Sequence, residues 1–135
     1  MYLLDTDILS NVVKPTPSLA LLARLAATPA ERLFTSSITL GELVYGAHRL
    51  GARGVALLSR IQNTVLGARP VLPFDASAAL RYGALRAELE RDGIPLGEAD
   101  LRIASIVLAR NLTVVTGNVG HFQRVTGLAV ENWLA

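Results

Sequence analysis

Short apolar segments alternate with longer helical patterns along the whole chain, and this alternation constrains the fold more than any other feature of the sequence. The apolar segments are expected to be strands, at residues 2–4, 33–35, 71–72, 112–115 and 128–130. Between them, helices are expected from about residue 7 to before Pro15, and then at 17–27, 39–51, 53–66, 75–93 and 98–110. Strands that alternate with helices of this length indicate crossover connections. The sequence therefore predicts an α/β fold with a mostly parallel sheet that is covered on both faces.

A single domain spanning residues 1–135 is expected, because the chain has the length of one ordinary domain and contains neither a repeat nor a linker. Hydrophobic residues make up 51% of it, which is typical of a globular protein. Cysteine is absent, so disulfides and thiolate zinc sites are excluded. The two histidines, His48 and His121, lie far apart in the sequence and form no HxxxH pair, which argues against a zinc site.

The charge pattern bears on location and partners. Asp5 and Asp7 fall within the first seven residues, where a secretory signal would be basic, and no apolar run reaches the roughly 20 residues of a membrane helix. We therefore expect a cytoplasmic protein. Twelve of the thirteen basic residues are arginine, with Lys14 the exception. Arginine suits bidentate contacts with phosphate, although a compositional bias explains the same excess.

Several acidic or amide residues fall where a strand ends or a helix begins. Asp5 follows the first strand, Glu42 and Asp100 open helices, and Asn118 follows the fourth strand. In a parallel α/β sheet the carboxyl ends of strands and the amino ends of the crossover helices share one edge, which is where ligands bind. The four side chains are therefore expected to project from the same edge.

A purely structural explanation exists for each of these residues. Asp5 or Asp7 could cap the next helix. Thr39 and Glu42 fit the capping-box pattern, in which the threonine caps the helix and the glutamate bonds back to it. Asn118 follows a glycine and could be a turn residue. The edge argument therefore generates candidates without choosing among them.

The same ambiguity holds for Glu98 and Asp100, which could simply complement a helix dipole, and Asp75 is expected to act only as a cap. Apolar neighbours nevertheless surround Asp5 and Glu42 in the sequence. A carboxylate in such a setting needs a partner. Because lysine is absent after Lys14, a hard divalent cation with oxygen ligands would serve.

These residues belong to an ordered set of motifs along essentially the whole chain. The motifs are Leu4-Asp5-Thr6-Asp7, Ser36-Ser37-Ile38-Thr39 with Glu42-Leu43 and Gly46, Leu72-Pro73-Phe74-Asp75, Tyr82-Gly83 with Arg86, Gly97 with Asp100 and Ile103-Ala104, Val115-Thr116 with Asn118, His121-Phe122, and Glu131-Asn132-Trp133. The set resembles the PIN-domain nucleases, and within them the VapC-type toxins of bacterial toxin–antitoxin pairs. The resemblance implies a three-layer α/β/α fold and an endoribonuclease that cleaves RNA with metal-activated water.

Carried over position by position, the resemblance makes Asp5, Glu42 and Asp100 the catalytic, metal-binding acids. Asn118 matches the fourth metal-site position, and the cofactor implied is Mg²⁺ or Mn²⁺. Thr6 matches a hydroxyl that lines such sites. The chemistry agrees, since a metal neutralises the phosphate, lowers the pKa of a bound water and orients an in-line attack.

Other positions have supporting roles in this comparison. Thr116 matches a second site hydroxyl. Asp7 stands where asparagine is more frequent, and the sequence assigns no role to its charge. Because Asn118 is neutral, it weakens the case for a second metal site. Glu98 is a candidate to supply the missing negative charge. Arg86 is the favoured contact to RNA phosphate, ahead of the weaker candidates Arg102 and Arg124.

The partners implied are RNA, with structured RNA such as tRNA as a candidate, and a cognate antitoxin protein. A homodimer is expected from the resemblance and from the mean hydropathy of +0.41. The alternative is a catalytically silent PIN-like module or a receiver-like binding module. Receiver-like modules use a lysine after a late strand, and residues 114–118 contain none.

Overall fold

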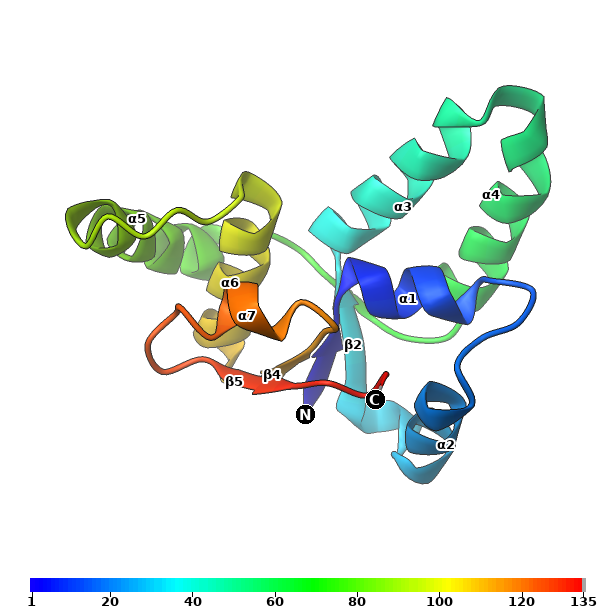
Figure 1. Ribbon diagram of the computed structural model, residues 1–135, viewed down its shortest axis with the longest axis horizontal. Helices are drawn as coiled ribbons and strands as arrows, with labels where there is room; N and C mark the ends of the chain where they lie inside the picture. The colour runs from blue at the N-terminus through cyan, green and yellow to red at the C-terminus, as the bar shows by residue number, and fades with distance from the viewer. Residues whose placement is uncertain (135) are drawn as a thin grey trace.

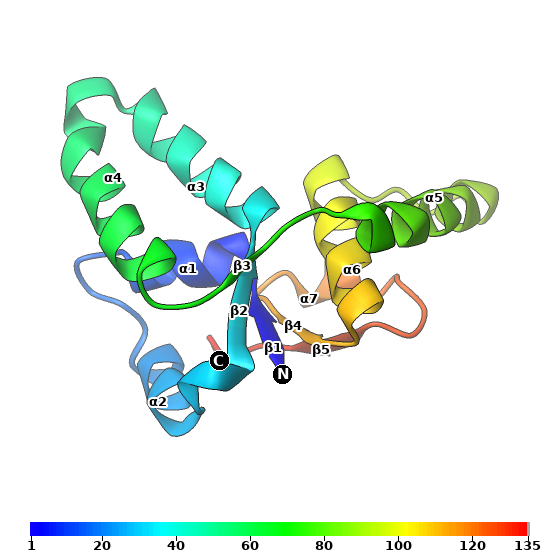
Figure 2. The same ribbon diagram turned by 180° about the vertical axis from the view of Figure 1, so that it is seen from behind.

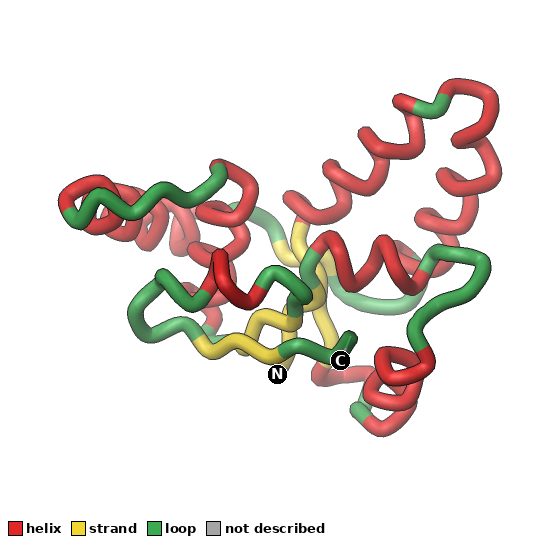
Figure 3. The backbone as a smooth tube through the Cα atoms, in the orientation of Figure 1, coloured by secondary structure: helices red, strands yellow, loops and turns green. Residues whose placement is uncertain are grey.

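The computed structural model describes residues 1–134. Its five strands form one parallel sheet in the order β3–β2–β1–β4–β5, as the alternation of elements predicts. The strands are short and lie between two groups of helices (Figure 3). Their bounds are β1 (Tyr2–Leu4), β2 (Leu33–Ser36), β3 (Val71–Leu72), β4 (Thr113–Val115) and β5 (Ala129–Glu131).

The helices cover the two faces of the sheet (Figures 1 and 2). One group comprises α1 (Thr6–Val12), α2 (Leu19–Ala27), α3 (Ser37–Arg49) and α4 (Val55–Ile61), with α3 and α4 forming an arm that projects from the sheet. The other comprises α5 (Ala76–Arg91), α6 (Glu98–Arg110) and the short α7 (Val119–Phe122). The chain also forms two short 3-10 helices, η1 (Ala30–Arg32) and η2 (Gly51–Gly54), and the π-helix η3 (Gln62–Leu66).

The sheet has a hydrophobic core on each face, because successive side chains of a strand point to opposite faces. Leu3 and Val114 point into the core beneath α5, α6 and α7. Their neighbours Leu4 and Val115 point into the core beneath α1 to α4, which is closed by Trp133. All five of these side chains are buried. The molecule is thus the three-layer α/β/α arrangement expected from the resemblance.

Helix starts differ from the sequence-based expectation in α2, α3 and α4, the last of which begins at Val55 rather than at Arg53. α2 begins at Leu19 rather than Pro17, because the hydroxyl of Ser18 accepts a hydrogen bond from the N–H of Leu21 and caps the helix. The expectation that Thr39 opens the next helix is wrong: Ser36 is the N-cap of α3. By contrast, Asp75 caps α5 through the N–H of Ala78, as predicted.

The arrangement of strands and helices fixes where polar side chains can gather. The carboxyl ends of β1 and β2 lead directly into α1 and α3 (Figure 1), and the loop after β4 leads into α7. Among residues 1–134, no helix is both long enough and apolar enough to cross a membrane.

Candidate active site

Asp5 lies at the carboxyl end of β1 and is almost completely buried, with 2% of its surface exposed. Its N–H donates to the carbonyl oxygen of Val115 at 3.0 Å, so the pairing of β1 with β4 extends to this residue. Its carboxylate accepts the N–H of Thr6 at 2.7 Å and the hydroxyl of Thr116 at 2.8 Å. Asp5 is also the N-cap of α1. The structural explanation, a helix cap, therefore holds for this residue, and its burial at the strand end leaves the site role as a prediction.

Burial raises the pKa of Asp5 from its ordinary value of 3.8 to about 6. The hydrogen bonds from Thr6 and Thr116 oppose this rise, while the charges of Asp7 and Asp100 add to it. Loss of solvation therefore outweighs crowding of like charge. None of the ion pairs among residues 1–134 involves Asp5. A buried carboxylate without a cationic partner is a place where a bound cation would be stabilising.

Asp7 ties the loop after β4 to the start of α1, which answers the question that the sequence left open. Its Oδ2 accepts the N–H of Gly117 at 2.8 Å. The hydroxyl of Thr116 donates a hydrogen bond to Asp5 and accepts one from the N–H of Asn118 at 2.9 Å. The two aspartates and the threonine therefore fix the path of residues 116–118 past the end of β1.

Glu42 reaches this edge from α3 and contacts α1. Its Oε1 accepts the hydroxyl of Thr6 at 2.6 Å, and that hydroxyl lies 3.2 Å from the hydroxyl of Thr39. Because Ser36 caps α3 by accepting the N–H of Thr39 at 3.1 Å, the capping-box explanation of Glu42 is wrong. Glu42 lies in the second turn of the helix, and its side chain is exposed rather than enclosed by its apolar neighbours.

A hollow of about 230 Å³ opens beside Glu42. Thr6, Ser10 and Glu42 line its polar part. Its apolar walls come from α1, α3 and α4, with Val13, Leu43, Leu57 and Ile61 among them. The candidate site is therefore continuous with a largely apolar groove.

Asp100 lies in the first turn of α6, as predicted, and its charge is felt at Asp5. One of its oxygens, Oδ2, lies 3.2 Å from Nδ1 of His121 in α7. The side chain of Asp100 is 23% exposed and that of His121 is 55% exposed. From the sequence, His121 was weighed as a zinc ligand and belonged to one of the family motifs, but its contact with Asp100 and the four-residue helix α7 were not predicted.

Asn118 is the N-cap residue directly before α7 and is exposed. Its backbone is held at both sides, because its N–H bonds to Thr116 and its carbonyl oxygen accepts the N–H of His121 at 3.1 Å. No hydrogen bond to its side-chain amide occurs within residues 1–134. The structure thus places Asn118 at the predicted edge with an amide available to a ligand.

Glu98 and Arg86 form a separate polar network between α5 and α6. The carboxylate of Glu98 accepts hydrogen bonds from the hydroxyl of Tyr82 and from Arg102, and these contacts lower its pKa. Arg86 donates to Tyr82 and to Glu90, and its hydrogen bond with Glu90 raises its pKa. Among residues 1–134, the hydrogen bonds of the Glu98 carboxylate therefore go to Tyr82 and Arg102, and none joins it to Asp5, Glu42 or Asp100.

The arrangement as it stands does not form a ready-made coordination shell. Within residues 1–134, no group of three or more aspartate, glutamate, histidine or cysteine side chains lies in position to hold a metal ion. Glu42 is engaged by Thr6, and Asp100 by His121. The donor chemistry nevertheless fits a hard divalent cation, since the edge offers carboxylate and amide oxygens and a buried acid without a cationic partner.

A family model described as "PIN domain" matches residues 2–128. The chain is 36% identical to the tRNA(fMet)-specific endonuclease VapC of Shigella flexneri, over 98% of this chain and 97% of the relative. The solved structure of DNA-bound VapBC from Salmonella typhimurium superposes with a TM-score of 0.90 at 35% identity, covering 98% and 97% of the two chains. VapBC2 from Rickettsia felis, bound to a promoter DNA fragment, gives 0.88 at 34% identity over 98% of each chain.

Proposed function

The chain belongs to the PIN-domain family, and from this premise we propose that it is a divalent-metal-dependent endoribonuclease that acts as the toxin of a toxin–antitoxin pair. The observation that carries the proposal is Asp5: a buried carboxylate with a raised pKa and no cationic partner, placed at the carboxyl edge of the sheet beside Asp7 and Asp100. The names of the relatives, which are endonucleases and ribonucleases, support the reaction class.

The cation in this proposal is Mg²⁺ or Mn²⁺. Asp5, Glu42 and Asp100 would hold it, with the amide oxygen of Asn118 as a further ligand. When bound, it would neutralise phosphate charge and activate water for attack on the phosphodiester. Glu42 would exchange its present partner, Thr6, for the ion, whereas Asp100 would offer the oxygen that His121 does not hold.

The chain's own residues prepare this site. Thr116 holds one oxygen of Asp5 by its hydroxyl, and the N–H of Thr6 holds the other. These contacts keep the carboxylate in one orientation while burial excludes water from it. Asp7 fixes the adjoining loop and so the distance of Asn118 from the site.

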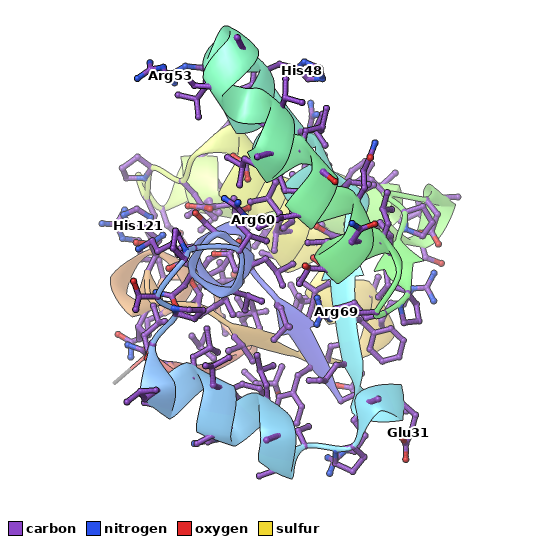
Figure 4. The ribbon with its side chains drawn as sticks, turned by 90° about the vertical axis from the view of Figure 1, so that its right-hand side faces the viewer. Glu31, His48, Arg53, Arg60, Arg69 and His121 are labelled. Atoms are coloured by element: carbon purple, nitrogen blue, oxygen red, sulfur yellow. The ribbon has the colours of Figure 1, made fainter. Side chains whose placement is uncertain are left out.

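RNA is the proposed substrate, and structured RNA such as tRNA is the candidate because the Shigella flexneri relative is named for it. Arg86 is the proposed phosphate contact. Its guanidinium is exposed, and Glu90 and Tyr82 hold it in place. Replacing Arg86 by glutamine should weaken RNA binding, whereas Arg53→Gln at the tip of the α3–α4 arm should not (Figure 4).

The proposed protein partner is an antitoxin, as in the VapBC complexes of the solved relatives. A segment of such a partner could bind in the apolar groove beside Glu42, and it would then block access to Glu42. We also propose a homodimer, with the strongly exposed Leu80 of α5 as a candidate contact. Light scattering that gives a 14.4 kDa particle at micromolar concentration would contradict the dimer.

Cleavage of purified tRNA tests the proposed activity. Wild-type protein should cleave in Mg²⁺ or Mn²⁺ and not in EDTA, and Asp5→Asn should lower the rate by orders of magnitude. Asp75→Asn is the matched control, since Asp75 is an exposed helix cap paired with Arg110 and asparagine caps about as well. Cleavage at equal rates by wild type and Asp5→Asn would remove Asp5 from the site, and no cleavage by either would favour a catalytically silent PIN domain.

A further inference from the structure

His121 is the one imidazole at the candidate site within residues 1–134, and no role has been assigned to it. Its Nδ1 lies 3.2 Å from Oδ2 of Asp100. The chain's other histidine, His48, lies near the tip of the α3–α4 arm, well away from His121 (Figure 4). The question is what a histidine at this position does for Asp100.

The backbone of His121 is held in place by its surroundings. Phe122, the next residue, is completely buried in the core beneath α6. The N–H of His121 donates to the carbonyl oxygen of Asn118 at 3.1 Å, and the N–H of Val125 donates to that of Phe122 at 3.1 Å. A packed anchor and a hydrogen-bonded turn therefore hold α7, short as it is, against the end of α6.

The chemistry of the contact determines which atoms are left over. A carboxylate is only an acceptor, so the contact requires that Nδ1 of His121 carries the proton and donates it to Asp100. Nε2 then faces away from Asp100. On Asp100, Oδ2 is taken by His121, while Oδ1 accepts no hydrogen bond from residues 1–134. One oxygen is thus held and the other is available.

We propose that His121 is a positioning residue that holds Asp100 through the Nδ1–Oδ2 hydrogen bond and so presents Oδ1 to a divalent cation. This inference rests on the proposed function, because Asp100 is one of the proposed metal ligands. In this role the imidazole does not itself bind the cation, because only its Nδ1 is needed, to hold Asp100. Groups that orient a metal-binding carboxylate in this way typically change metal affinity or activity by about 10- to 100-fold when they are removed.

Two substitutions separate the positioning role from a merely structural one. In His121→Asn the side-chain amide places a donor roughly where Nδ1 lies and removes Nε2. In His121→Leu a side chain of comparable bulk remains and the donor is lost. His48→Leu is the matched control, because it removes the other exposed histidine at a distance from the site.

The experiment measures Mn²⁺ affinity from the paramagnetic signal of free Mn²⁺, together with kcat and KM for tRNA cleavage and the Tm in EDTA. His121→Leu should weaken Mn²⁺ binding and lower kcat by about 10- to 100-fold with KM and the Tm in EDTA unchanged. In His121→Asn, Mn²⁺ affinity and kcat should both lie within a few-fold of wild type. In an Asp100→Asn background, His121→Leu should weaken Mn²⁺ binding no further, because the two residues act as a unit.

Wild-type Mn²⁺ affinity in His121→Leu would overturn the inference alone. An equal loss in the asparagine and leucine variants would also overturn it, because it would assign the role to Nε2. If wild-type protein itself neither binds Mn²⁺ nor cleaves tRNA, the proposed function fails, and the inference falls with it.

Discussion

Gly117 and Asp7 are in such close contact that the loop after β4 has no room for a side chain at residue 117. The N–H of Gly117 donates to Oδ2 of Asp7 at 2.8 Å, and a Cβ built on Gly117 would lie 2.7 Å from the same oxygen. It would also lie 2.9 Å from a methyl carbon of Leu134. The absence of a side chain is therefore what allows Asp7 to hold this loop beside Asp5.

The first prediction concerns Gly117→Ala. The added methyl group should force Asp7 away, break its hydrogen bond and displace Asn118, at a cost of about 1–3 kcal/mol in the free energy of unfolding. RNA cleavage should fall as well. Gly83→Ala is the control: nothing lies within 4 Å of a Cβ there, and alanine is the better helix former. Chemical denaturation measures both, and equal stability for the two variants would show that the loop tolerates the clash.

The second prediction separates the charge of Asp7 from its hydrogen bond. Asp7→Asn keeps an oxygen for the N–H of Gly117 and removes a negative charge that raises the pKa of Asp5. It should therefore be at least as stable as wild type in EDTA at pH 7. Asp7→Ala leaves the N–H of Gly117 without its partner and should lose about 1–3 kcal/mol. A lower Tm for asparagine than for alanine would refute this assignment.

The third prediction is a pH dependence of stability. Burial gives Asp5 a folded-state pKa of about 6 against an ordinary value of 3.8, so between these values the folded protein binds more protons than the unfolded chain. The contribution of Asp5 to stability is present below pH 3.8 and is lost as the pH rises through about 6. The loss approaches about 3 kcal/mol if the full shift is expressed, at 1.36 kcal/mol per pKa unit. Between pH 4.5 and pH 7, urea denaturation in EDTA should show about 2 kcal/mol of this loss in wild type, because the rest has already occurred by pH 4.5. A pH-independent baseline for Asp5→Asn would identify its source.

Much of the fold could be predicted from the sequence because short apolar segments, several with β-branched residues, alternate with longer helical patterns. β1 and β3 have the predicted bounds, and Asp75 caps α5 as its position suggested. The start of α3 was misjudged because both Ser36 and Thr39 are good capping residues. Tertiary packing buries Thr39 against α1 and leaves the cap to Ser36.

The candidate site was harder to predict in its details than in its location. Asp5, Glu42, Asp100 and Asn118 lie at the predicted edge, since that follows from the topology alone. The engagement of Glu98 by Tyr82 depends on how α5 packs on α6, which local sequence does not encode. The contact of His121 with Asp100 was missed because four residues give too little helical periodicity to predict α7.

Loss of solvation and the charges of neighbouring carboxylates both act on Asp5. In the structure, loss of solvation raises the pKa of Asp5 more than the charges of Asp7 and Asp100 do. Replacing Asp5 therefore tests the site more directly than replacing Asp100, because it removes the buried charge itself.

The most direct measurement is the melting temperature of wild type and Asp5→Asn at pH 7, each in EDTA and in Mn²⁺. If Asp5 is the buried ligand of a cation site, Asp5→Asn should melt higher than wild type in EDTA, since asparagine carries no charge to desolvate and still caps α1. Mn²⁺ at a hundredfold excess over its dissociation constant should stabilise wild type by about 2.7 kcal/mol and leave Asp5→Asn nearly unchanged. A lower Tm for Asp5→Asn in EDTA, together with equal shifts of both proteins by Mn²⁺, would contradict the account and leave Asp5 as a helix cap only.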